Sequence, residues 1–130
     1  MDKPRDLAKR TKNFALRIIR IYVALPKTPV ALVIGRQMLR SGTAVGANYR
    51  EATRARSKSE YAAKMNIALM ELEETSYWLE LLEEGRISNH PEVTALRSEA
   101  SELSAIFVSM IKKVRQGINQ SERQVLSSAF

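Results

Sequence analysis

The residues that could carry out chemistry in this 130-residue chain are few and poorly placed for it. The single histidine, His90, precedes Pro91 at an expected helix start, so we expect a solvated residue near a helix cap rather than a ligand. Di-iron sites in helical proteins need Glu-x-x-His pairs, and Glu71 and Glu74 have no such second ligand set. A serine nucleophile would lack an activating base. We therefore predict no catalytic residue, metal, cofactor or small-molecule substrate, and no enzyme.

Positive charge is the stronger chemical signal, with 21 basic against 14 acidic residues and a formal net charge of +7. Residues 1–20 and 36–64 each carry seven basic and two acidic side chains, whereas residues 71–86 carry six glutamates and one arginine. Such a polarised field favours polyanions, and arginine binds phosphate oxygens bidentately. The predicted nucleic-acid contacts are Arg5, Lys9, Lys12, Arg20, Arg36, Arg40, Arg50, Arg54, Arg56 and Lys58.

The charge pattern leaves two functions open. No aromatic ladder is interleaved with the basic residues and no helix-turn-helix spacing is present, so binding would be led by phosphate contacts, sensitive to salt and poor in sequence discrimination. We predict nucleic-acid binding, with RNA slightly preferred over DNA. The alternative is a protein-interaction or scaffold module with no nucleic-acid role, in which the charge is a solvated helix face that gives solubility.

Four amphipathic helices are expected to position these side chains, because apolar residues recur at spacings of three and four. Short connections between long helices predict antiparallel neighbours, and hence an all-α, up-down-up-down four-helix bundle over residues 1–117. The helices are expected from Arg5 to Leu25, from Val30 to Arg54, from the Ser57-Lys-Ser-Glu60 capping box to Gly85, and from an Asn89 cap to Gly117.

Two segments need a separate explanation. Gly35, Gly42 and Gly46 fall inside the second helix, where each costs about 1 kcal/mol relative to alanine. Close approach of a neighbouring helix would explain them, and a break near Gly42 is the competing interpretation. Residues 118–130 are predicted to form a tail, with a short helix at Ser121-Glu-Arg-Gln124 docked on the bundle or on a neighbouring subunit.

The first and third predicted helices each carry a second apolar stripe besides the one that faces the core. One core cannot bury both stripes, and a helix that is apolar on two sides is usually buried on two sides. We therefore expect a homo-oligomer, the alternative being that the helix from the Ser57 capping box to Gly85 is the central helix of a larger fold. The predicted interface residues are Leu16, Ile19, Val23, Ile67, Met70, Tyr77 and Leu81.

Polar residues also occur at or beside the expected buried seams of the bundle. Asn48 and Glu51 lie three apart, close to Arg54 and Arg56, which makes a network tied by arginine available. We interpret the set as a network that sets helix register, in preference to a binding site. Its members are Gln37, Ser41, Asn48, Glu51 and Glu74.

The segments Gln37-Met-Leu-Arg-Ser-Gly-Thr-Ala-Val-Gly-Ala-Asn-Tyr-Arg-Glu-Ala52 and Ala68-Leu-Met-Glu-Leu-Glu-Glu-Thr-Ser-Tyr-Trp78 resemble the bacterial four-helix bundle proteins encoded in intervening sequences of 23S rRNA genes. The resemblance implies an up-down bundle and a ring-like homopentamer. Accessory proteins of diversity-generating retroelements, which are basic pentamers that bind nucleic acid, look similar at a greater distance. The family often has glycine after the Asn-x-x-Glu glutamate, where this chain has Ala52, so we expect its second helix to run on smoothly.

The composition also bears on the compartment. The chain has no cysteine, its first ten residues are highly charged, and its longest apolar stretch, residues 28–35, is far shorter than the about 20 residues that cross a bilayer. These features predict a cytoplasmic protein without a membrane span.

Overall fold

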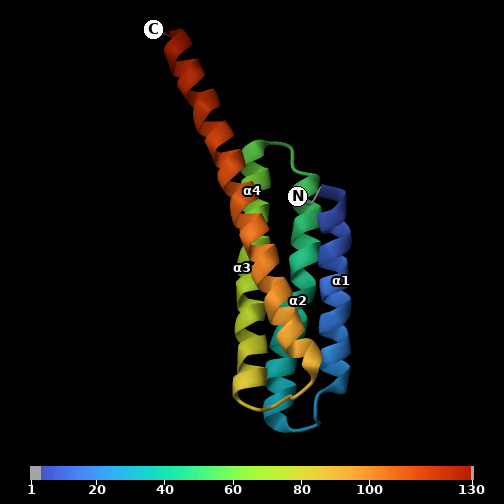
Figure 1. The fold of residues 1–130 in the computed structure, drawn as a ribbon. Coiled ribbons are helices and arrows are strands. Elements are labelled where there is room, and N and C mark those ends of the chain that lie inside the picture. The colour runs from blue at the N-terminus through green and yellow to red at the C-terminus, as the bar shows by residue number, and fades with distance from the viewer. Residues whose placement is uncertain (1–3, 130) are drawn as a thin grey trace.

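The computed structural model describes residues 4–129 and the side chains of residues 6–127. Within this part the chain forms four helices and no strand, which confirms the predicted all-helical class. The helices are α1 (Pro4–Ala24), α2 (Pro29–Thr53), α3 (Lys58–Glu84) and α4 (Pro91–Ala129). Loops 25–28 and 85–90 lie at one end of the molecule, and loop 54–57 lies at the other, next to the start of α1 (Figure 1).

The three glycines of α2 lie against side chains of α1. A Cβ atom at Gly35 would come within 2.6 Å of Leu25 Cδ1, and one at Gly42 within 2.9 Å of two Ile18 carbons. A Cβ at Gly46 would lie 3.2 Å from Thr11 Oγ1. The glycines therefore permit close packing, and α2 runs through Gly42 without the break that was the competing interpretation.

The core follows the predicted stripes closely on α1 and α3. On α1 burial recurs at the predicted spacings of three and four, at Leu7, Thr11, Phe14, Ile18 and Ile21. On α3 Met65, Leu72 and Leu79 are fully buried. On α2 the same spacing, through Ile34 and Met38, predicts that Val30 is buried; this was wrong, because Val30 lies in the first turn of the helix and is 58% exposed. Sequence reasoning missed Tyr49, which is fully buried and stacks on Phe107 of α4 with ring centroids 6.1 Å apart.

The helix starts are set by local hydrogen bonds. Ser57 caps α3 as predicted, since its hydroxyl accepts a bond from the Glu60 amide at 3.0 Å. For α4 the predicted Asn89 cap was wrong by one position. The helix begins at Pro91, and the Glu92 amide donates to Nδ1 of His90 at 3.1 Å, so the exposed His90 takes the capping place.

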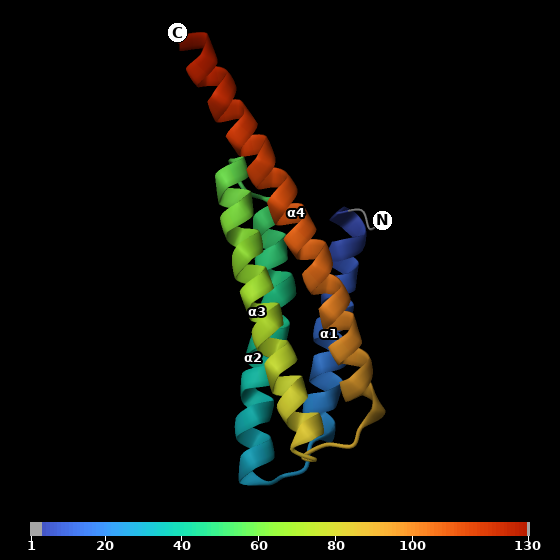
Figure 2. The same cartoon turned by 60° about the vertical axis from the view of Figure 1, so that its left-hand side comes forward.

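The last helix is longer than expected. The prediction that it ends before Gly117 was wrong, because α4 continues through this glycine and is 39 residues long. Its last turns project beyond the rest of the molecule (Figure 2), and Val125 and Leu126 are exposed. The described part of the tail therefore is not a separate helix docked on this chain. No helix among the described residues is long and apolar enough to cross a membrane.

Candidate nucleic-acid interface

Basic residues from distant parts of the sequence meet at the end of the molecule that holds loop 54–57. Helix α1 begins at this end and supplies Lys9 and Lys12, while α2 ends there with Arg50 (Figure 1). The loop and the first residue of α3 add Arg54, Arg56 and Lys58. We call these six residues the basic end. The helix dipoles offset one another at this loop, since the negative end of α2 and the positive end of α3 flank it, so the field comes from the side chains.

The remaining predicted contacts fall elsewhere. Arg20 lies near the end of α1 and Arg36 near the start of α2, so both are close to loop 25–28, at the opposite end of the molecule. The side chain of Arg5 lies outside the described residues. The predicted set is therefore not one continuous surface.

Ion pairing separates the basic end from the other cations. Among the described side chains, no ion pair involves Lys9, Lys12, Arg50 or the three cations of residues 54–58. Arg40 differs, because its guanidinium pairs with Glu71 at 3.1 Å and with Glu74. The hydrogen bond to Glu74 raises the pKa of Arg40. Arg40 is therefore a poor candidate for phosphate contact, because it already holds two carboxylates.

The acidic stretch of α3 is likewise neutralised within the chain. Arg97 of α4 pairs with Glu83 and lies 3.6 Å from both Glu80 and Glu84. On the other side of α4, Arg10 forms a bidentate pair with Glu99 at 2.7 and 2.8 Å. The described ion pairs therefore neutralise glutamates of α3 and α4 and include none of the six side chains of the basic end, although Glu51 and Glu60 lie beside Arg54 and Arg56.

Helix α4 adds three cations that sequence reasoning missed, namely Lys112, Lys113 and Arg115. Lys113 lines a pocket of about 710 Å³ together with Arg56, Lys58 and the two tyrosines Tyr49 and Tyr61. Lys58 reaches toward α4, since its Nζ lies 3.7 Å from the position of a Cβ on Gly117. All three lie within the helix that was predicted to end at Gly117, so the missed signal was this short basic run, which sequence reasoning did not connect with Arg56 and Lys58.

The two tyrosines stay uncharged at neutral pH. Burial, followed by the neighbouring Tyr61, raises the pKa of Tyr49 to about 12. Burial also raises the pKa of Tyr61. Neither hydroxyl therefore subtracts from the positive charge of the basic end.

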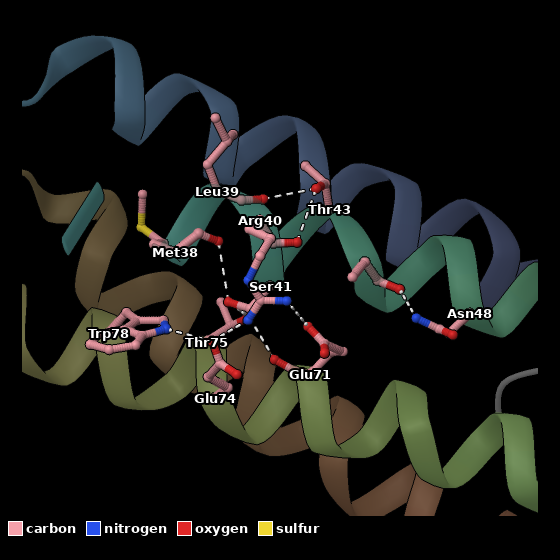
Figure 3. A network of polar contacts seen from close by, with 11 residues as sticks. Met38, Leu39, Arg40, Ser41, Thr43, Asn48, Glu71, Glu74, Thr75 and Trp78 are labelled. Atoms are coloured by element: carbon pink, nitrogen blue, oxygen red, sulfur yellow. Dashed lines mark hydrogen bonds and ion pairs between the residues drawn. The ribbon is translucent and has the colours of Figure 1, made fainter. Parts of the chain in front are cut away.

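The polar residues of α2 and α3 form separate contacts rather than the single network that was predicted (Figure 3). Thr75 Oγ1 lies 2.8 Å from Ser41 Oγ, with both side chains fully buried. Glu74 accepts bonds from Arg40 and from the Trp78 indole at 3.0 Å.

The other members of the predicted network do not join these contacts. Asn48 donates to the Ala44 carbonyl one turn earlier at 2.9 Å. Glu51 pairs with Lys64 at 3.2 Å, and Gln37 is exposed. The prediction that arginine ties Asn48 to Glu51 was wrong, because Lys64 of α3 faces Glu51 across the helix pair.

The second apolar stripes are exposed in the single chain. On α1 Leu16, Ile19 and Val23 are 39–69% exposed, and on α3 Ile67, Met70 and Tyr77 are 41–60% exposed. Leu81 is only half-buried. Helices α1 and α3 each contact both α2 and α4, with no direct α1–α3 packing among the described residues, so the two stripes lie on different helices across the molecule.

The described residues also hold no group of three histidine, aspartate or glutamate side chains placed to bind a metal. Fold and surface together define a small helical protein with a cationic end and unpartnered apolar faces. The chain belongs to the 23S rRNA-intervening sequence protein family, whose model matches residues 4–109.

A solved structure supports the same relationship. The chain is similar to a protein of unknown function from the S23 ribosomal protein family of Bacteroides thetaiotaomicron, with 36% sequence identity and a TM-score of 0.78. The match covers 85% of this chain and 99% of that one. No curated protein matches the chain.

Proposed function

We propose that this protein is a non-enzymatic, antiparallel up-down four-helix bundle that assembles into a ring-like homo-oligomer and binds nucleic acid, RNA in preference to DNA, through its basic end. The observation that carries the proposal is the concentration of six cations that form no ion pair among the described side chains. Cations of this kind bind phosphates with release of counterions. Five glutamates of α3, in contrast, pair with arginines of α2 and α4.

The oligomer is supported by the apolar stripes on α1 and α3. These stripes are different surfaces on different helices, so contact of one with the other on a neighbouring copy would be heterologous. Heterologous contacts close into rings when the rotation between copies permits it, and the resemblance to the family implies five copies. A ring would repeat the basic end in each subunit and raise the avidity for a polyanion.

The test is a binding titration across a salt series. After light scattering has fixed the number of subunits, the protein is titrated into labelled structured RNA and duplex DNA. The variant Arg54→Glu/Arg56→Glu reverses two cations of the basic end. We expect its affinity to fall at least about tenfold and its logarithmic salt slope to drop by roughly two, one for each lost phosphate contact.

The matched control is Lys27→Glu/Arg36→Glu, which makes the same charge change near loop 25–28 on exposed residues. We expect it to keep most of the affinity, since it lies at the opposite end of the molecule. Equal losses in the two variants would show that net charge alone drives binding. No binding of the wild-type protein at low salt would overturn the proposal and favour the scaffold function, for which the exposed Val125 and Leu126 would be a contact surface.

A further inference from the structure

The pocket at the basic end combines an apolar interior with a cationic rim. It opens between the end of α2, the start of α3 and the later part of α4. Tyr49 and Ala52 line it from the core, where both are buried and Tyr49 stacks on Phe107, and the half-buried Val114 supplies apolar surface. Tyr61 is only half-buried, so part of its ring borders the open space. The volume of the pocket, about 710 Å³, lies within the range of roughly 300–1,000 Å³ typical of small-molecule sites.

The cations border the pocket from two sides. Arg56 comes from loop 54–57 and Lys113 from α4, while Lys58, at the start of α3, reaches across so that its Nζ lies beside Gly117 of α4. None of the three takes part in an ion pair among the described side chains. The arrangement therefore suits a flat apolar body that carries negative charge on both flanks.

An unpaired nucleotide within a polynucleotide has this chemistry, because its base lies between two phosphates. A lipid would place its anionic headgroup at one end of a long chain and would leave one side of the rim unused. We propose that the pocket receives one unpaired base, which stacks on Tyr61 while the three cations contact the flanking phosphates. This inference rests on the proposed function and narrows it to nucleic acid with single-stranded segments.

The pocket is partly outside the segment shared with the family. The family match ends at residue 109, whereas Lys113, Val114 and Gly117 form the α4 side of the pocket. Gly117 lies beside the end of Lys58, whose Nζ would be 3.7 Å from a Cβ atom at this position. The α4 side of the pocket therefore consists of residues beyond the segment that matches the family model.

The test compares three RNAs that share one duplex. The first is blunt, the second carries a short single-stranded extension, and the third carries an extension of the same length made of abasic nucleotides. The abasic extension keeps the added phosphates and removes the bases. We expect the wild-type protein to bind the natural extension about tenfold more tightly than the other two RNAs, as base stacking on an aromatic ring predicts.

Two variants of Tyr61 locate the effect. Tyr61→Phe keeps the ring and should retain the preference, whereas Tyr61→Leu keeps apolar volume without the ring and should lose it. Lys113→Gln should weaken binding to the extended RNA more than Lys112→Gln, because Lys112 does not line the pocket. Circular dichroism confirms that each variant is folded.

The outcomes separate this inference from the proposed function. If the wild-type protein binds all three RNAs equally, the pocket does not take a base, although nucleic-acid binding stands. If it binds none of them, both proposals fail. A change of oligomeric state in Tyr61→Leu, with unchanged RNA preference, would overturn the inference and assign the pocket to a second copy of the chain.

Discussion

The buried contact between Thr75 and Ser41 is the clearest residue-scale test of how α2 and α3 recognise each other (Figure 3). Thr75 Oγ1 also lies 2.7 Å from the Glu71 carbonyl, and Ser41 Oγ lies 3.4 Å from the Met38 carbonyl. We expect Thr75→Val to cost about 1–2 kcal/mol of unfolding free energy, since it leaves a buried serine hydroxyl without its best partner. Guanidinium unfolding measures the loss.

The double variant Ser41→Ala/Thr75→Val is the control for this prediction. Replacing both polar groups by apolar ones of similar shape removes the unsatisfied hydroxyl, so the double variant should be more stable than the sum of the single changes predicts. Strict additivity of the two losses would mean that the hydroxyls do not interact.

At the same scale, the core residues were predictable from the sequence and the polar partners were not. Leu7, Phe14 and Ile18 follow from helical spacing alone, because burial repeats with the turn of the helix. The partners of Arg40 and Glu51 depend on which helix lies opposite and in which register. Tyr49 was missed because its aromatic hydroxyl group lowers its apparent hydrophobicity, although its ring packs on Phe107 from a helix distant in sequence.

The packing of α1 on α2 gives the element-scale prediction. In Gly42→Ala the added methyl group would lie 2.9 Å from two carbons of Ile18, which is branched and buried. Overpacking of this kind costs about 1–3 kcal/mol, which exceeds the gain of about 1 kcal/mol in helix propensity. We expect a net loss of stability in urea unfolding.

Gly117→Ala is the matched control, since it makes the same substitution inside a helix where the new methyl meets only the flexible end of Lys58 at 3.7 Å. It should leave stability unchanged or raise it by up to about 1 kcal/mol. A stabilised Gly42→Ala would show that α1 can shift outward at little cost.

The limits of sequence reasoning at the element scale lie at the helix ends. The Ser57 cap was readable because its hydroxyl accepts from the Glu60 amide three residues later, whereas the Glu60 carboxylate accepts from the Arg56 amide rather than from that of Ser57. Gly117 predicts a stop because glycine often ends helices, but glycine only permits an end and the residues after it, such as Ile118 and Val125, remain compatible with a helix. The glycines of α2 gave the opposite result, because their repeated spacing indicated packing rather than termination.

At the scale of the whole molecule, charge is divided between a basic end and glutamates that are paired. The candidate site could be predicted only in part. Segments 1–20 and 36–64 were visibly basic, but their convergence with Lys113 depends on the path of α4.

The pairing of the glutamates couples the stability of the fold to pH. A hydrogen bond from Arg10 lowers the pKa of Glu99, and bonds from Trp78 and Thr94 lower the pKa values of Glu74 and Glu83.

A carboxyl group with a lowered pKa in the folded state stabilises that state above its unfolded pKa of about 4.3, and the contribution is lost as pH falls through the folded value. Stability should therefore be steady near neutral pH and fall below about pH 5. Denaturant midpoints measured from neutral to acidic pH test this.

Glu99→Gln should be less stable than the wild type at neutral pH and converge with it in acid, because protonation removes the same charge. Glu73→Gln, an exposed change outside the described ion pairs, should parallel the wild type. A constant gap between Glu99→Gln and the wild type at all pH values would mean that Glu99 acts through packing and not through its ion pair with Arg10.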